Sequence, residues 1–230
     1  MFISAENLTQ SFPTAGGQVY ALRSVSFGIE EGEVVVILGS SGAGKSSLLN
    51  LLGGMESPAS GKLFVDGRDI AALSPKQLTA YRRKEVGFVF QFYNLLPNLT
   101  AYENIRLAAE LARTGNAAEA LSAVGLTHRR SSFPAQLSGG EQQRIAIARA
   151  LVKDPKLILC DEPTGALDSA TGKSVMELLF RVQSERRKTL VIVTHNAELA
   201  RCADRVIVLH DGEIVENRLQ SRVSVEEIAW

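Results

Sequence analysis

One stretch of the chain decides the fold: residues 34–47 have the sequence VVVILGSSGAGKSS. Its first five residues are apolar throughout, which predicts a strand that is buried on both faces. The following residues match G-x-x-x-x-G-K-[ST] and lead into an expected helix over residues 45–52, which ends at Gly53 and Gly54. A strand, a glycine-rich turn and a helix in this order are typical of a phosphate-binding loop, and these flanks disfavour a chance glycine-rich turn.

The predicted loop has the chemistry that a nucleotide requires. Glycines let backbone N–H groups approach a phosphate closely, and the helix directs its free N–H groups and positive dipole end at the anion. Lys45 would place its charge on the β- and γ-phosphates, the Ser46 hydroxyl would bind Mg²⁺, and Ser47 would add a donor. The candidate nucleotide-binding residues of this loop are Gly39, Ser40, Ser41, Gly42, Ala43, Gly44, Lys45, Ser46 and Ser47.

A second apolar strand, expected over residues 157–160, ends in the two carboxylates Asp161 and Glu162. In P-loop enzymes an acidic residue at this place meets the Mg²⁺ opposite the serine, so Asp161 is the candidate metal-linked carboxylate, through water. Glu162 is the candidate for orienting and deprotonating the attacking water, a contribution of about 10²–10⁴-fold in rate. Taken alone, the pair could also be the cap at the entry to a helix.

Local signals predict how the other segments alternate. Residues 2–38 are expected to form strands, and the Asp-Gly pairs at 66–67 and 211–212 predict hairpin turns. Ser74, Thr100 and Ser138 each precede a Gln or Glu three residues later, which is typical of a helix start. A further helix is expected over about residues 171–184, between the strand at 157–160 and another at 190–193.

Residues 137–141 have the sequence LSGGE and lie between the loop and the acidic strand end along the chain. A capped helix beginning at Ser138 would by itself account for these residues. However, two glycines in a first helical turn cost about 1 kcal/mol each relative to alanine. We therefore expect that something requires the bare backbone here, such as a second phosphate site at a helix N-terminus.

With these three motifs the chain resembles the ABC ATPase family, whose hallmark is LSGGQ. Leu137, Ser138, Gly139, Gly140 and Glu141 match that signature, with Glu in place of Gln. The resemblance covers essentially the whole chain and implies ATP and Mg²⁺ as ligands and ATP hydrolysis as the activity.

The resemblance also implies an α/β fold: a P-loop NTPase (RecA-like) core with an antiparallel β subdomain and an inserted α-helical subdomain. We expect a single ABC ATPase domain over residues 1–230. Its core with the β subdomain would comprise residues 1–91 and 154–230, and the helical subdomain with LSGGE would comprise residues 92–153.

Four further positions match functional residues of the family. Tyr20 matches the aromatic residue that stacks on adenine, worth about 1–3 kcal/mol per base in other base-binding proteins, although a core aromatic is the alternative. Gln91 matches the glutamine that links the Mg²⁺ and water site to the helical lobe. Asp168, in the segment GALD, matches the acid of the loop that crosses the dimer. His195 matches the γ-phosphate-sensing histidine, whereas a lone histidine after a strand is more often only a satisfied structural residue.

In this family the signature segment closes over the ATP of the opposite subunit. This chain has one phosphate loop and one signature segment. The resemblance therefore implies that two chains meet head to tail around two ATPs, as a homodimer with closed two-fold symmetry if both chains are identical.

Residues 88–105, FVFQFYNLLPNLTAYENI, are too apolar for an ordinary exposed loop. We expect them to contribute a groove for a helix of another protein, and packing of the inserted lobe is the alternative. Residues 90–97, 163–169 and 194–196 give a finer resemblance to the ATPases of lipoprotein release, macrolide efflux and antimicrobial-peptide resistance. That subgroup implies a permease partner with few transmembrane helices and a large extracytoplasmic domain.

Composition limits the other classes of function. Lys and Arg total 25, as do Asp and Glu, so the zero net charge gives no electrostatic case for nucleic acid as a partner. The start of the chain lacks the features of a signal peptide, and the apolar run at 34–38 is far short of the ~20 residues that cross a bilayer. We expect a protein held at the cytoplasmic face of the inner membrane by its permease.

Several other functions share parts of this pattern. An ABC importer ATPase shares much of the sequence, but usually carries an additional C-terminal regulatory domain. Soluble ABC proteins of DNA repair contain long coiled coils, and those of translation contain two ATPase halves in one chain. A kinase or GTPase with the same phosphate loop would leave LSGGE and His195 unexplained.

Overall fold

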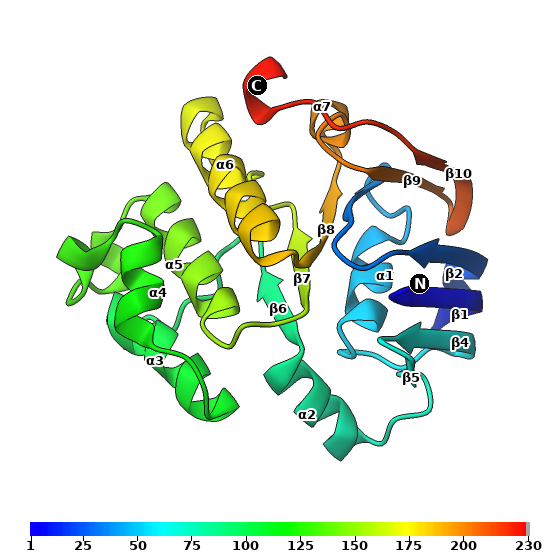
Figure 1. Ribbon diagram of the computed structural model, residues 1–230. Helices are drawn as coiled ribbons and strands as arrows, with labels where there is room; N and C mark the ends of the chain where they lie inside the picture. Colours follow the sequence, from blue (N-terminus) through cyan, green and yellow to red (C-terminus); the bar gives the residue numbers. More distant parts are fainter. Residues whose placement is uncertain (229–230) are drawn as a thin grey trace. The chain divides into compact units, whose positions relative to one another are not determined.

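The computed structural model in Figure 1 describes residues 1–228 of the chain. The chain forms two compact units: unit 1 spans Met1–Arg82 and resumes at Thr189, and unit 2 spans Arg83–Lys188. The expected helical subdomain at 92–153 lies entirely within unit 2.

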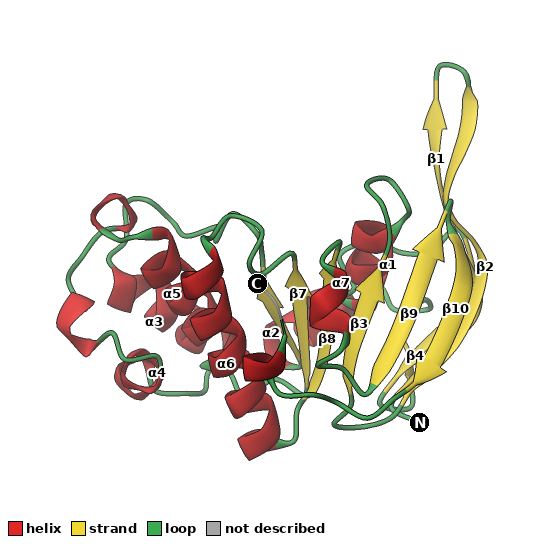
Figure 2. Cartoon of the chain, turned by 90° about the horizontal axis from the view of Figure 1, so that it is seen from above, coloured by secondary structure: helices red, strands yellow, loops and turns green. Residues whose placement is uncertain are grey.

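Unit 1 contains an antiparallel sheet with the strand order β2-β1-β4-β5. Its strands are β1 (Ile3–Thr14), β2 (Gly17–Ile29), β4 (Ser60–Val65) and β5 (Arg68–Asp69). Because β4 pairs with β1 only as far as Thr9, the tip of the β1–β2 hairpin continues as a two-stranded ribbon, which Figure 2 shows extending beyond the sheet.

The other strands of unit 1 have the order β10-β9-β3-β8, with β3 parallel to both of its neighbours and β10 antiparallel to β9. These strands are β3 (Val34–Leu38), β8 (Thr189–Thr194), β9 (Arg205–His210) and β10 (Glu213–Leu219). Val34–Ile37 of β3 are completely buried, which confirms the prediction of a strand that is covered on both faces.

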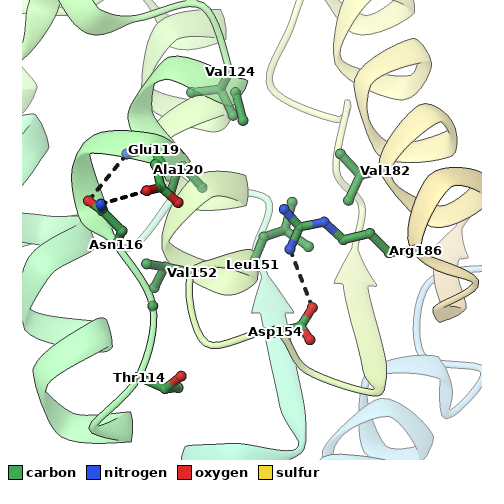
Figure 3. A pocket seen from close by; sticks show the side chains of 13 residues that line it. Thr114, Asn116, Glu119, Ala120, Val124, Leu151, Val152, Asp154, Val182 and Arg186 are labelled. Atoms are coloured by element: carbon green, nitrogen blue, oxygen red, sulfur yellow. Dashed lines mark hydrogen bonds and ion pairs between the residues drawn. The ribbon is translucent and has the colours of Figure 1, made fainter.

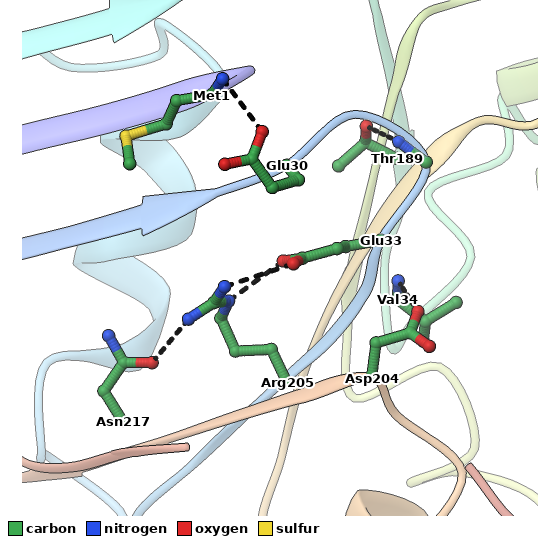
Figure 4. Close-up of polar contacts among 9 residues, drawn as sticks. Met1, Glu30, Glu33, Val34, Thr189, Asp204, Arg205 and Asn217 are labelled. Atoms are coloured by element: carbon green, nitrogen blue, oxygen red, sulfur yellow. Dashed lines mark hydrogen bonds and ion pairs between the residues drawn. The ribbon is translucent and has the colours of Figure 1, made fainter. Parts of the chain in front are cut away.

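Polar contacts fix the start of β3 against β9 (Figure 4). The Asp204 carboxylate accepts a hydrogen bond from the Val34 N–H at 2.8 Å. Arg205 donates to both carboxylate oxygens of Glu33, at 2.9 and 3.1 Å, and also to the side chain of Asn217. A bidentate ion pair of this kind fixes the relative orientation of the two side chains as well as their distance. The strand that leads into the phosphate loop is therefore held at its start.

Both expected hairpin turns are present. Asp66 and Asp211 have φ values of 50° and 48°, and the glycines that follow them have positive φ as well. This backbone matches the twist of the flanking antiparallel strands. The turns join β4 to β5 and β9 to β10.

The helices of unit 1 are α1 (Lys45–Leu52), α2 (Pro75–Lys84), which continues into unit 2, α7 (Ala197–Ala200) and the short 3₁₀ helix η3 (Val225–Glu227). Two of them, α1 and α2, begin where the local signals predict. The bounds of α1 are the predicted ones. At the start of α2, the Gln77 side chain accepts hydrogen bonds from the backbone and hydroxyl of Ser74, as expected for a cap.

Unit 2 is mostly helical, with one pair of parallel strands. Its elements are β6 (Val86–Val89), α3 (Ala101–Ala112), α4 (Ala117–Ala123), η1 (Thr127–Arg129), η2 (Pro134–Gln136), α5 (Gly139–Leu151), β7 (Leu157–Asp161) and α6 (Ser169–Arg186). Helix α5 packs against α3, α4, α6 and β6. The helix expected at about 171–184 is two residues longer at each end: Asp168 caps its earlier start, and Arg187 in a left-handed conformation ends it.

In the part of the chain that the structure describes, no helix is long and apolar enough to cross a membrane. The thiols of Cys160 and Cys202 are buried and unpaired. Burial raises the pKa of both thiols.

Candidate active site

The predicted phosphate loop connects β3 to α1 within unit 1. Gly44 has a φ of 102°, and a Cβ there would lie 2.2 Å from the carbonyl oxygen of Ala21, so the position requires glycine. The Lys45 side chain is 9% exposed, and its Nζ donates to the carbonyl oxygens of Gly39 at 2.8 Å and Ser40 at 2.9 Å. These two bonds keep the ammonium group within the loop.

The N-terminus of α1 has no side-chain cap, because its N-cap residue is Gly44. Ser40, Ser41 and Ser46 are exposed beside it, whereas Ala43 is buried under the loop. Uncapped N–H groups and the helix dipole together favour an anion. The loop, the ammonium group and the helix end therefore fit the phosphates of a nucleotide.

A metal ion would need ligands beyond the protein in this setting. Residues 1–228 contain no group of three or more His, Cys, Asp or Glu side chains that could hold an ion by themselves. Mg²⁺ usually binds through one or two protein ligands together with substrate phosphates and water. The exposed Ser46 hydroxyl at the start of α1 suits such a shared site.

His195 lies at the same edge of the sheet as the phosphate loop. Leu38, the residue before the loop, is paired with Thr194, the residue before His195, in the parallel β3–β8 register. Ligands of parallel α/β sheets bind at this carboxyl edge. His195 is exposed, and Asn196 after it caps α7, so the local cap is provided by the asparagine.

Tyr20 lies on β2 in the part of the hairpin beyond β4, opposite Ser11. The side chain is 41% exposed, and the Arg23 guanidinium carbon lies 5.1 Å from the centre of its ring. The alternative of a core aromatic is therefore wrong, and the exposed ring is available for stacking.

In unit 2, the candidate acidic residues and Gln91 lie at one strand edge. Val89 of β6 pairs with Cys160 of β7, so the residues that follow each strand leave the sheet together. A Cβ on Gly165 would lie 2.8 Å from Gln91 Nε2 and 3.4 Å from Glu162 Cβ, which places the Gln91 amide against the turn after Glu162. Asp161, the last residue of β7, and Glu162 are both partly exposed.

The signature segment begins α5 as predicted. Ser138 Oγ accepts from the Glu141 N–H, and a Glu141 carboxylate oxygen accepts from the Ser138 N–H at 2.8 Å. The other oxygen of Glu141 accepts from Arg129 Nε at 2.8 Å. The Ser138 N–H, followed by Arg129, lowers the pKa of Glu141. Glu at this position therefore completes a capping box and an ion pair, while Leu137 before it is buried.

The two signature glycines have close neighbours within unit 2. A Cβ on Gly139 would lie 2.7 Å from the Tyr93 hydroxyl oxygen and 3.3 Å from Leu167 Cδ2. A Cβ on Gly140 would lie 2.2 Å from Thr171 Cγ2. Packing inside the chain thus already disfavours a side chain at either glycine, and the second phosphate site stays a prediction.

Asp168 is exposed and is the N-cap of α6, where its carboxylate accepts from the Thr171 N–H at 3.0 Å. The Thr171 backbone hydrogen bond also lowers the pKa of Asp168. From the sequence, Asp168 was expected only in the dimer loop, and this cap was not predicted, although Asp before a helical pattern is a common cap signal. Its contact across a dimer stays a prediction.

The apolar stretch 88–105 divides into exposed and buried parts. Phe92 and Leu96 are 73% and 46% exposed, whereas Ile105 is fully buried within α3. The backbone after Gln91 is held by Arg149 of α5, which donates to the carbonyl oxygens of Tyr93 and Asn94. Sequence reasoning did not find this contact because the partners are more than fifty residues apart.

A separate cavity of about 200 Å³ lies among α4, α5 and α6 in unit 2 (Figure 3). Val124, Leu151 and Val182 contribute to its apolar wall, and the Arg186–Asp154 ion pair, at 3.3 Å, lies at its edge. None of the predicted site residues lines this cavity, and it has no part in the candidate site.

A parallel strand, a glycine-rich loop enclosing a lysine ammonium and an uncapped helix define a P-loop nucleotide-binding protein. The antiparallel sheet, the mixed α/β core and the helices around the signature segment agree with the predicted fold. The chain belongs to the ABC transporter family, whose model matches residues 22–165.

Individual relatives agree with the predicted subgroup. The macrolide export ATP-binding/permease protein MacB of Salmonella typhi is 46% identical over 217 residues, which are 92% of this chain and 33% of MacB. The chain thus spans about a third of the length of that relative. The lipoprotein-releasing system ATP-binding protein LolD of Syntrophotalea carbinolica is 47% identical over 218 residues, 92% of this chain and 96% of LolD.

Solved structures confirm the fold. The chain is similar to the ATP-binding cassette MJ0796, a protein of Methanocaldococcus jannaschii. Its dimeric structure in a post-hydrolysis state, bound to ADP and Pi, matches with a TM-score of 0.89 and 40% identity, covering 96% of this chain and 100% of that chain.

Proposed function

We propose that this chain is the ATP-binding and ATP-hydrolysing subunit of a bacterial ABC transporter or mechanotransmission complex. The observation that carries the proposal is the phosphate loop, in which the buried Lys45 ammonium lies beside the uncapped start of α1. An ABC importer ATPase and a soluble ABC ATPase outside transport are the alternatives.

The residues of unit 1 would bind the nucleotide. Tyr20 stacks on the adenine, and the loop at 39–47 binds the phosphates with Lys45 on the β- and γ-phosphates. Ser46 holds Mg²⁺, and His195 contacts the γ-phosphate. The position of His195 at the carboxyl edge of β8, level with the end of β3, supports this role.

The residues of unit 2 would carry the reaction. Bound Mg²⁺–ATP supplies the phosphoryl group and the charge neutralisation that its transfer requires. Glu162 orients and deprotonates the attacking water, Asp161 and Gln91 help to hold the metal, and Gln91 lies against the turn that follows Glu162.

We also propose that two copies of the chain sandwich two ATPs. Ser138, Gly139 and Gly140 of each copy would contact the ATP of the other copy, and Asp168 would lie in the contact between them. The dimeric MJ0796 structure supports this arrangement by similarity. ATP then holds the pair together, and hydrolysis releases it.

A membrane permease is the proposed partner, and it would hold the chain peripherally at the cytoplasmic face of the membrane. The exposed apolar side chains of Phe92 and Leu96, next to Gln91, support a docking role for the 88–105 stretch. The names of MacB and LolD support export or the handling of lipoprotein-, peptide- or macrolide-like cargo.

Two substitutions test the enzymatic proposal. Glu162→Gln should bind ATP, turn over at a small fraction of the wild-type rate and accumulate as a dimer with ATP and Mg²⁺ in gel filtration. Lys45→Ala should lose nucleotide binding, measured with a fluorescent ATP analogue. The exposed residues Glu177 and Lys62 provide matched controls as Glu177→Gln and Lys62→Ala.

Two results would contradict the enzymatic proposal. Unchanged nucleotide affinity in Lys45→Ala would remove Lys45 from its role, and a monomeric Glu162→Gln protein would count against the sandwich.

The transport proposal needs a separate experiment. The tagged protein would be purified from detergent-solubilised native membranes, and its partners identified by mass spectrometry. A co-purifying permease with few transmembrane segments and a large outer domain supports mechanotransmission. A permease with many segments would favour an importer or channel-type exporter, and recovery without any membrane partner would overturn the transport role.

A further inference from the structure

Gln143 lies in the second turn of α5, five residues after the helix cap at Ser138, and its side chain is completely buried. Its Nε2 donates to the backbone carbonyl oxygen of Pro163 at 2.8 Å. Because a carbonyl oxygen only accepts, the amide must present its NH₂ group to Pro163. Among the described residues, the Oε1 atom of the same amide has no hydrogen-bond partner.

This arrangement is unfavourable for packing alone. A buried amide whose oxygen lacks a partner is less stable than an apolar side chain of similar size. The interior around Gln143 would therefore accept Leu or Met more readily. What the amide adds is its hydrogen bond to Pro163, which joins α5 to the segment after β7.

That hydrogen bond reaches the turn that carries the candidate general base. Glu162 precedes Pro163 and has a φ of 45°, a left-handed conformation that residues other than glycine seldom adopt. A following proline disfavours helical conformations further. The Gly165 N–H donates to the Glu162 carbonyl oxygen at 3.0 Å, so this bond and the one from Gln143 both restrain the strained turn.

We propose that Gln143 is a positioning residue for Glu162: its amide ties the Glu162–Pro163 turn to the helix that starts with the signature segment. The inference rests on the proposed function, in which Glu162 activates water and Ser138–Gly140 contact the ATP of the other subunit. When α5 moves as Ser138–Gly140 close over that ATP, the hydrogen bond from Gln143 moves the Pro163 carbonyl with it. This movement orients the Glu162 carboxylate. The base of each subunit thus responds to the nucleotide of its partner.

The test compares Gln143→Leu with a matched control, Gln183→Leu. Gln183 of α6 is also buried, and its Nε2 also donates to a backbone carbonyl oxygen, that of Lys188 at 3.1 Å. Both variants lose a similar hydrogen bond, but only the first contacts the turn at Glu162. Steady-state ATP hydrolysis gives kcat and KM for both, and thermal unfolding gives their stability.

Gln143→Leu should lower kcat about tenfold or more, because small misplacements of a reacting group have effects of this size. Its KM for ATP should stay within about twofold of wild type, and Gln183→Leu should keep both constants. A folded Gln143→Leu protein with the wild-type kcat, or an equal loss in Gln183→Leu, would overturn the inference.

Gln143→Glu keeps the inference testable if Gln143→Leu does not fold. An ionised carboxylate cannot donate to Pro163, whereas the protonated acid can, and burial raises the pKa of the introduced group. Its kcat relative to wild type should therefore rise as the pH falls from about 8 to about 6. A ratio that does not change with pH would count against the positioning role.

The outcomes separate the inference from the proposed function. If the wild-type protein does not hydrolyse ATP, or if Glu162→Gln retains full turnover, the proposed function fails. If those two controls behave as expected and Gln143→Leu is fully active, only the role of Gln143 fails.

Discussion

Replacing Gly140 by alanine should destabilise this protein, although the same change stabilises most helices. Gly140 is the second residue of α5, and alanine is favoured over glycine in a helix by about 1 kcal/mol. Here, however, the new Cβ would lie 2.2 Å from Thr171 Cγ2. Thr171 is β-branched, and its N–H is bonded to Asp168, so relief requires an unfavourable rotamer or a shift of α6.

The expected magnitude follows from these opposing effects. Overpacking a well-packed site costs about 1–3 kcal/mol, and the helix preference of about 1 kcal/mol offsets part of this cost. Gly140→Ala should therefore lower the free energy of unfolding by up to about 2 kcal/mol. Thr171→Ser removes the obstructing methyl group, so in that background Gly140→Ala should become stabilising by about 1 kcal/mol. The coupling between the two sites is then about 1–3 kcal/mol.

Urea unfolding of the wild type, both single variants and the double variant measures this coupling, provided that the m-values agree. A Gly140→Ala protein as stable as wild type, with no coupling to Thr171→Ser, would refute the packing argument. ATP hydrolysis by the double variant adds a second result. Normal stability with lost turnover would show that the bare backbone at Gly140 also serves a bound nucleotide.

Two further predictions concern Glu141 and Cys160. The Ser138 N–H and Arg129 lower the pKa of Glu141 in the folded protein. The Glu141 carboxylate therefore stabilises the folded state fully at pH values above the ordinary carboxyl pKa. This stabilisation is lost as the pH falls through the lowered pKa of the folded state. Between about pH 7 and pH 3, the free energy of unfolding should decrease more for wild type than for Glu141→Gln. Equal decreases in the two proteins would contradict this. Burial followed by the nearby Asp161 charge raises the pKa of Cys160, so a Cys202→Ser protein should resist thiol reagents until urea unfolds it. Rapid labelling of the native protein would show that the thiol is accessible.

The elements that were predicted correctly from the sequence are determined by residues that are close together in the chain. The strand Val34–Leu38, the helix Lys45–Leu52 and the capping box of Ser138 and Glu141 were each predicted, and the structure confirms all three. In these cases apolar pattern, glycine placement and a cap three residues away determine the conformation locally. The family prediction, which combined such local motifs, is confirmed by the match to the ABC transporter model.

The features that were not predicted from the sequence are contacts between segments that are far apart in the chain. The contact of Gln143 with Pro163 joins residues 20 positions apart, and that of Arg149 with Tyr93 joins residues 56 apart. Neither side chain belongs to a motif, and a Gln or Arg on a helix is more often solvated. The close approach of Thr171 to Gly140 joins residues 31 positions apart and was not predicted either, so a helix start and a phosphate site were the only two explanations offered for the glycine.

The two hydrogen bonds from Lys45 to backbone carbonyl oxygens determine when its side chain loses conformational entropy. A free lysine side chain gives up about 1.5–2 kcal/mol of rotamer freedom when it is fixed, and in this protein that loss occurs when the chain folds. An arriving polyphosphate meets a cation that is already aimed, so its affinity should be governed mainly by charge and should weaken as ionic strength rises. Inorganic pyrophosphate, which has the charge but no base, should then compete with ATP for the same loop.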